Sequence, residues 1–244
     1  MYMRKIIGIN NRDYQAYRKA YSKGSFNGAY YYAKEIEENI IPLVNTDYNW
    51  DLLGMRMTGH MNHSLIFIHH NIDMDTVYSW LDKYHDIILI VSQQHVFTWA
   101  VEHGYKAILL PLSIDVGYVE RFKSKKKFGA CYAGNRWPFK KEDEEKIPKG
   151  VDFPPPNLPR EELLKFIAPY KQCYAIGRCA MEAKVLGCEI LPFYWRYPDP
   201  SHWKIFDNAD AARMLQRALE LIEEDGHSVN CFDFPEYKLL NGGQ

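Results

Sequence analysis

Short runs of apolar residues alternate with segments of helical periodicity through most of the chain. The runs typical of strands in the first half lie at residues 5–9, 40–44, 65–68, 87–91 and 107–110. The segments typical of helices lie between them, at residues 29–39, 76–84 and 94–103. Parallel strands need a long return connection, which is usually a helix, so this alternation predicts an α/β fold with parallel sheets.

The same alternation restarts after the basic segment Arg121–Lys127. The expected strands of this second half lie at residues 128–133, 172–175 and 188–191, and the expected helices at 160–167, 177–186 and 209–224. The last helix closes the second half, with Asp207 or Asn208 as its N-cap and Gly226 at its end. We therefore predict an N-terminal domain at residues 1–116, a linker at 117–127 and a C-terminal domain at 128–244.

The composition is that of an ordinary soluble globular protein, with 47% hydrophobic and 25% charged residues. The net charge of −1 gives no general attraction to nucleic acids or anionic membranes. The five cysteines form no Cys-x-x-Cys pair, which favours free thiols in a reducing compartment over a zinc site. No apolar run suits a signal peptide or a membrane span, so we expect a cytoplasmic protein.

The segment from Tyr174 to Phe193 carries the strongest indication of a binding site. It reads as loop, helix, glycine stop and apolar strand, and Gly177 opens the helix. A helix that begins at a glycine turn presents unpaired N–H groups to a phosphate, and Arg178 would stand beside that phosphate. Glu182, one turn inside, can accept hydrogen bonds from a ribose. The alternative is an ordinary α/β unit with a surface Glu and an Arg that faces solvent or pairs with a carboxylate.

Two further groups of residues lie where α/β proteins bind ligands, at the carboxyl ends of strands. Gly134 and Arg136 follow the expected strand 128–133, and Lys140 and Lys141 come soon after them. The adjacent pair His69 and His70 follows the expected strand 65–68. Cations at such positions can stabilise the negative charge of a bound phosphate, which a site without a metal ion must do.

The order of these pieces resembles the GT-B fold glycosyltransferases, in particular the retaining families that use nucleotide sugars. The resemblance covers residues 80–195 well and the first 80 residues more weakly, and the chain is short for this fold. It implies two Rossmann-like parallel-sheet domains that face each other across a cleft. It also implies transfer of a sugar from a UDP- or GDP-linked donor, held by the second domain, to an acceptor hydroxyl beside the first.

The resemblance assigns roles to the residues that match the motifs of the family. It implies that the diphosphate and nucleotide are held by Gly134, Arg136, Lys140, Lys141, Gly177, Arg178 and Glu182. It implies that His69 or His70 contacts the sugar as a catalytic residue. Replacement of Glu182 by Ala is then expected to weaken donor binding and to leave the fold intact.

One departure from the family pattern keeps alternatives open. Tyr174 stands eight positions before Glu182, where many members carry a first Glu near the transferred sugar. A non-catalytic module that binds a nucleotide sugar is therefore one alternative. A glycosyltransferase acting on modified DNA bases through Arg121–Lys127 is another, and an unrelated phosphate-binding α/β protein is a third.

The acceptor is left open by the sequence: a glycan, a protein, a small molecule or modified DNA would each fit. We expect no required cofactor beyond the donor itself and no bound metal. The one Asp-x-Asp sequence, Asp73-Met-Asp75, is a weak candidate for a metal site, because it equally suits the cap of the following helix.

Overall fold

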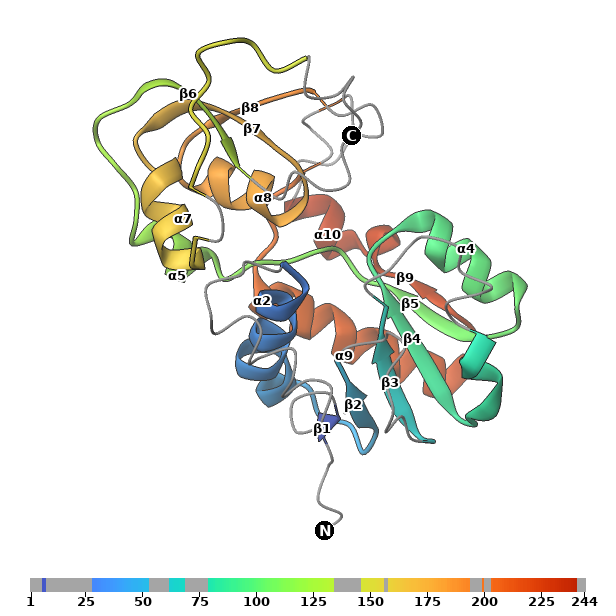
Figure 1. Ribbon diagram of the computed structural model, residues 1–244. Helices are drawn as coiled ribbons and strands as arrows, with labels where there is room; N and C mark the ends of the chain where they lie inside the picture. Colours follow the sequence, from blue (N-terminus) through green and yellow to red (C-terminus); the bar gives the residue numbers. More distant parts are fainter. Residues whose placement is uncertain are drawn as a thin grey trace. The chain divides into compact units, whose positions relative to one another are not determined.

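The computed structural model shows an α/β protein with two sheets of parallel strands (Figure 1). It describes residues 6–7, 28–52, 62–68, 79–133, 146–155, 158–193, 199 and 203–240. These residues form two compact units. The first unit is built from β1 (Ile6–Ile7) and residues 29–111 and 208–240, and the second from residues 112–207.

The first unit contains a six-stranded parallel sheet in the order β1-β2-β3-β4-β5-β9. After β1, its strands are β2 (Asn49–Asp51), β3 (Ser64–Phe67), β4 (Ile87–Val91), β5 (Lys106–Leu109) and β9 (Val229–Asn230). Every residue of β3 and β4 is buried, as expected for central strands covered on both faces. The apolar runs that predicted these two strands are therefore the core of the unit.

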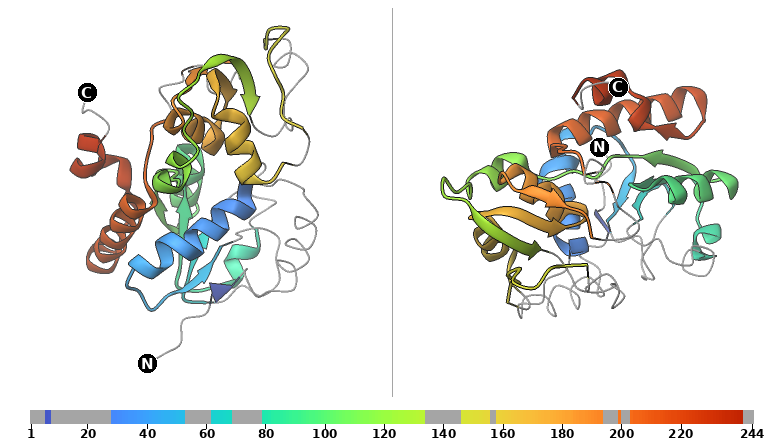
Figure 2. Two further views of the ribbon diagram at one scale, coloured as in Figure 1. Left: turned by 90° about the vertical axis from the view of Figure 1, so that its left-hand side faces the viewer. Right: turned by 90° about the horizontal axis from the view of Figure 1, so that it is seen from above.

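Helices and helical turns surround this sheet. They are α2 (Gly28–Glu35), η1 (Ile36–Ile40), η2 (Ile41–Leu43), η3 (Ser79–Lys83), α4 (Gln94–Glu102), α9 (Asn208–Asp225), η5 (Cys231–Asp233) and α10 (Pro235–Leu240). Side chains of η3 and α4 pack on one face of β3, β4 and β5. Helix α9 contacts η1, η2, β5 and β9 (Figure 2). Among the described residues, no helix has both the length and the apolar character needed to cross a membrane.

The strand predicted at residues 40–44 is wrong. The chain instead continues from α2 through the π-helical turn η1 into the 3-10 turn η2. Pro42 explains this, because its fixed φ and missing N–H suit the first turn of a helix and would break a central ladder. The sheet is completed by β2, whose three residues are too few to give a periodic signal even though Trp50 and Asp51 are buried.

The division of the chain also differs from the predicted boundary. Helix α9 begins and ends within one residue of its predicted limits, but it packs on the first unit, and β9 pairs with β5. Its apolar face is fully buried there, through residues that include Leu215, Ala218 and Ile222. The sequence reveals that this face must be covered but does not reveal which sheet covers it.

The second unit contains a three-stranded parallel sheet in the order β6-β7-β8. Its strands are β6 (Phe128–Ala133), β7 (Tyr170–Ala175) and β8 (Glu189–Leu191), and its helices are α5 (Val116–Glu120), α7 (Arg160–Ile167) and α8 (Gly177–Val185). Helix α5 overlaps the predicted linker 117–127 and begins one residue before it. The side chain of Asp115 caps it by accepting a hydrogen bond from the Tyr118 N–H at 2.8 Å.

The basic segment that precedes β6 contains a lysine with a structural role. Lys127 Nζ donates hydrogen bonds to the carbonyl oxygens of Ala168 and Leu186, both at 2.6 Å. These carbonyls lie at the ends of α7 and α8, where no further helical N–H is available to them. One ammonium group therefore caps the carboxyl ends of two helices, where its positive charge interacts favourably with the negative ends of both helix dipoles.

Replacement of Lys127 by Met is expected to destabilise the second unit by about 1–3 kcal/mol, because two partly buried carbonyls lose a charged donor. Urea denaturation measures this change. Replacement of the exposed neighbour Lys126 by Met is the matched control and is expected to change stability by less than about 0.5 kcal/mol. Equal effects of the two substitutions would contradict the capping role of Lys127.

Candidate functional site

The turn between β7 and α8 has the geometry that the sequence predicted. Gly177 begins α8 with φ of 61°, in the left-handed region that glycine adopts without strain. The helix ends at a second glycine of positive φ, Gly187. Because β7 is a parallel strand, the first N–H groups of α8 lie at the carboxyl edge of the sheet. This is the position at which α/β proteins bind anions.

Two arginines converge on the carboxylate of Glu182 in this unit. The Nε and Nη2 atoms of Arg160 lie 3.0 and 2.9 Å from Glu182 Oε1, and Nη2 of Arg178 lies 3.8 Å from the same oxygen. Glu182 is only 3% exposed, and both guanidinium groups are nearly buried. Arg178 and Glu182 lie one turn apart on α8, and Arg160 is the first residue of α7.

This cluster revises the expected roles of Glu182 and Arg178. The alternative in which Glu182 is an ordinary surface residue is wrong, because the carboxylate is buried and accepts from Arg160. Arg178 pairs with a carboxylate, as one of the alternatives held, and it also stands in the first turn of α8. Arg160 was not found from the sequence, because 22 positions separate it from Glu182 and no spacing rule links the two.

A tyrosine from a third helix extends the cluster. The guanidinium carbon of Arg160 lies 5.2 Å from the ring centroid of Tyr118 in α5, and that of Arg121 lies 5.8 Å from the same centroid. Both distances are within the range of cation–π attraction. Helices α5, α7 and α8 therefore bring three arginines to one region of the second unit, close to the first turn of α8.

The thiol of Cys179, beside this cluster on α8, has a raised pKa. Cys179 is partly exposed by surface area, but surrounding protein atoms raise the pKa of its thiol to about 12, and the nearby carboxylate of Glu182 adds to this. The thiol therefore stays protonated at neutral pH. Cys131, Cys173 and Cys188 are buried free thiols.

Tyr174, the departure from the family pattern, has a packing role. Its side chain is buried, and its ring meets Phe193 edge-on at 6.2 Å between centroids. Phe193 in turn meets Tyr132 at 5.7 Å, so the three rings form one cluster beside the sheet. This position supplies an apolar ring and no acidic group.

The other predicted site residues lie outside the described residues. These are His69, His70, Gly134, Arg136, Lys140 and Lys141, together with the alternative metal residues Asp73 and Asp75. Their roles stay predictions. Within the described ranges, no group of three His, Cys, Asp or Glu residues is arranged to hold a metal ion.

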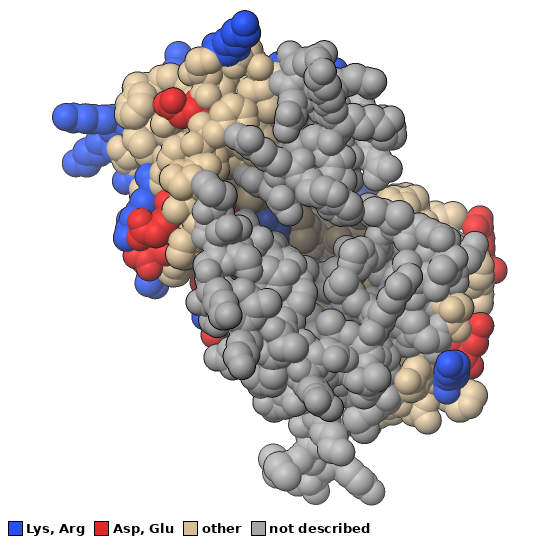
Figure 3. Space-filling view, in the orientation of Figure 1, with Lys and Arg blue, Asp and Glu red and all other residues tan. Residues whose placement is uncertain are grey.

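Two lysines of the basic segment Arg121–Lys127 are held in local contacts. Lys123 pairs with Glu120 at 2.6 Å, and Lys127 lies between the ends of α7 and α8. On α7, Lys165 pairs with Glu161 and Glu162. Figure 3 accordingly shows acidic side chains among the basic ones on this part of the second unit. Interspersed charges of this kind offer little attraction to a nucleic acid backbone.

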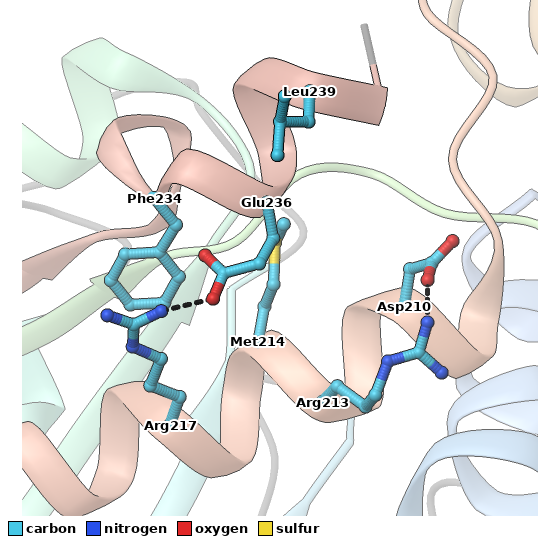
Figure 4. A pocket seen from close by; sticks show the side chains of 7 residues that line it. All are labelled: Asp210, Arg213, Met214, Arg217, Phe234, Glu236 and Leu239. Atoms are coloured by element: carbon cyan, nitrogen blue, oxygen red, sulfur yellow. Dashed lines mark hydrogen bonds and ion pairs between the residues drawn. The ribbon is translucent and has the colours of Figure 1, made fainter.

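A groove of about 360 Å³ lies in the first unit, between α9 and the C-terminal helix (Figure 4). It is lined by Asp210, Arg213, Met214, Arg217, Phe234, Glu236 and Leu239. Its two arginines are paired with its two carboxylates, and the guanidinium of Arg217 lies 4.7 Å from the ring centroid of Phe234. The charges cancel and no predicted site residue lines the groove, so it is distinct from the phosphate site predicted at α8.

No known protein family, curated protein or solved structure matches this chain. The two parallel sheets agree with the predicted α/β class.

Proposed function

We propose that the protein is a glycosyltransferase that moves a sugar from a nucleotide-sugar donor to an acceptor hydroxyl. The observation that carries the proposal is the position of Arg178 in the first turn of α8, directly after the turn at Gly177. The proposal includes two Rossmann-like domains that face each other across a cleft. It also includes binding of the donor diphosphate by Arg136, Lys140 and Lys141. The resemblance of the chain to GT-B fold enzymes supports it.

Arg178 suits a diphosphate for two reasons. A guanidinium can form two parallel hydrogen bonds to phosphate oxygens, and the N–H groups of α8 add partial positive charge at the same point. When the glycosidic bond breaks, the departing nucleoside diphosphate gains negative charge, which these groups stabilise. Arg160 of α7 supplies a second guanidinium, so that two cations share the single carboxylate of Glu182 and positive charge is left in excess.

In this proposal Glu182 is chiefly a positioning residue. Its buried carboxylate holds Arg160 at hydrogen-bond distance and Arg178 at 3.8 Å, so the cations are oriented before any ligand arrives. A site that is oriented beforehand spends less free energy on reorganisation during the reaction. A contact between Glu182 and a ribose stays a prediction.

Titration calorimetry with UDP, GDP and their sugar conjugates tests the proposal. Replacement of Arg178 by Gln is expected to weaken binding of the preferred nucleotide at least tenfold, or about 1.4 kcal/mol, while Arg160 still pairs with Glu182. Replacement of Lys165, an exposed cation on α7, by Gln is the matched control. Unchanged nucleotide affinity in the Arg178 variant would remove this residue from the site.

The packing of Tyr174 favours one second candidate, a module that binds a nucleotide sugar without turnover. An enzyme usually hydrolyses its donor slowly when no acceptor is present, and mass spectrometry detects the released nucleotide. Binding without any hydrolysis would favour the module. Equal stabilisation by sugar phosphates and by UDP or GDP would instead favour a general phosphate-binding protein.

Retention on a DNA column that falls as the salt concentration rises would support the candidate that acts on modified DNA bases. The interspersed charges around α5 and α7 weigh against this result.

A further inference from the structure

A histidine is held between two carboxylates at the amino edge of the six-stranded sheet. His63 directly precedes β3, and Asp86 directly precedes β4. Asp47 and Tyr48 directly precede β2. We call these four residues the His63 clamp. Since the strands are parallel, the clamp lies at the opposite edge from their carboxyl ends, where α/β proteins bind ligands.

Both ring nitrogens of His63 contact a carboxylate. Nδ1 contacts Asp86 Oδ2, and Nε2 lies 3.1 Å from Asp47 Oδ1. An ionised carboxylate can only accept, and a neutral imidazole carries a single N–H. Both contacts can therefore be hydrogen bonds only when the ring is a doubly protonated imidazolium. The geometry of the clamp is that of a charged histidine.

A tyrosine completes the clamp. The ring of Tyr48 stacks on the imidazole at 4.0 Å between centroids and 18° between planes. Its hydroxyl donates to Asp86 Oδ1 at 3.1 Å. A cation over an aromatic face is attracted by the electrons of the ring, so the stacking also favours the protonated histidine.

The backbone of the clamp joins the starts of three strands. The Asn49 N–H donates to the His63 carbonyl at 2.9 Å, and the Ser64 N–H donates to the Asp86 carbonyl at 3.2 Å. His63 and Asp86 have φ of 56° and 53°, a left-handed conformation that few residues other than glycine adopt. Such a conformation costs free energy and persists only where other contacts impose it.

We propose that the His63 clamp is a pH-dependent set of contacts. It holds the amino ends of β2, β3 and β4 together while the imidazolium is protonated and releases them when the imidazolium loses its proton. After this loss, one carboxylate keeps no N–H donor from the ring. The two aspartates then repel each other without a cation between them. The attraction between the imidazolium charge and Asp86 is also lost, which weakens the side-chain contact that joins the strained residues His63 and Asp86.

The two carboxylates of the clamp favour the protonated state of His63, and further charged groups act on its neighbours. Besides the two aspartates of the clamp, Glu223 of α9 acts on Tyr48, and Lys106 at the start of β5 acts on Asp86. The hydrogen bond with Asp86 raises the pKa of His63, the contact with Asp47 adds to this, and partial burial opposes it. The hydrogen bond with His63 in turn lowers the pKa of Asp86.

These directions define the pH range in which the clamp is closed. The pKa of His63 is raised in the folded protein. The contribution of His63 to the stability of the folded state is therefore complete below about pH 6.5, and it is lost as the pH rises through the folded pKa. The pKa of Asp86 is lowered in the folded protein. The contribution of Asp86 to the stability of the folded state is therefore present above about pH 3.9, and it is lost as the pH falls through the folded pKa. The contacts of the His63 clamp are therefore formed in weak acid and are lost toward alkaline pH.

Nuclear magnetic resonance tests the proposal on the full chain. The ring proton signals of His63 are expected to titrate with a midpoint above 6.5, and Asp86→Asn is expected to lower this midpoint. The protection of the Ser64 amide against hydrogen exchange, corrected for the intrinsic rate, is expected to fall severalfold as His63 deprotonates. His63→Gln is expected to abolish this pH dependence.

Two further variants keep the test decisive. His85→Gln changes an exposed neighbouring histidine and is expected to leave the pH dependence of Ser64 protection intact. If His63→Gln does not fold, Asp47→Asn removes one exposed carboxylate and is expected to lower the His63 midpoint by a smaller amount. A His63 midpoint at or below 6.5, or Ser64 protection that does not change across that midpoint, would overturn the proposal.

Discussion

Replacement of Glu182 by Ala is expected to lower the free energy of unfolding by about 3–5 kcal/mol, because it leaves two nearly buried guanidinium groups without their shared carboxylate. Urea denaturation followed by circular dichroism measures this loss. The sequence alone predicted that the substitution would spare the fold, and the burial of the carboxylate reverses that expectation.

Glu161 provides the matched control for this substitution. It lies on α7, one residue from Arg160, but its side chain is more than half exposed and its pair with Lys165 faces solvent. Exposed pairs contribute at most about 1 kcal/mol, so Glu161→Ala should be nearly neutral. If Glu182→Ala also changed stability by less than about 1 kcal/mol, Glu182 would not be holding the two arginines.

Replacement of Leu215 by Ala is expected to destabilise the first unit by about 2–5 kcal/mol, although the residue lies beyond the whole second unit in the sequence. Leu215 is fully buried on the face of α9 that packs within the first unit. Hydrogen exchange resolved along the chain measures where protection is lost. We expect the loss in β3, β4 and β5 and little change in β6 and β7.

Arg213 is the control on the same helix, because its side chain is largely exposed and pairs locally with Asp210. Arg213→Ala should leave exchange in both sheets within experimental error. Loss of protection confined to β6, β7 and β8 after Leu215→Ala would instead support the domain boundary that the sequence predicted.

The sequence predicted those elements whose signal is local. Strand β4 is a run of five large apolar residues, and α7 combines an amphipathic pattern with acidic residues in its first turn. The sequence predicts both with the bounds that the structure shows, and the same holds for β6. The short strands β2 and β9 lack enough residues for periodicity, and Pro42 lies in an apolar run that resembles a strand by composition alone.

The residues of the candidate site also divide into those that local spacing identifies and those that only tertiary packing brings together. Gly177, Arg178 and Glu182 were found because one helix places them at fixed spacings from its start. Arg160 and Tyr118 belong to other helices and meet Glu182 or one another only through tertiary packing. The burial of Glu182 also follows from that packing, which is why its positioning role could not be predicted from the spacing.

The discontinuity of the first unit has a consequence for synthesis on the ribosome. Since translation proceeds from the amino terminus, the three-stranded sheet is complete once Leu191 has emerged, whereas the six-stranded sheet lacks its edge strand until Asn230 follows. The nascent chain therefore carries an unfinished apolar surface on η1 and β5 while the segment made after it can already fold. A premature stop codon between these two points would leave that surface exposed in the released product, which would make it a substrate for chaperones and proteases.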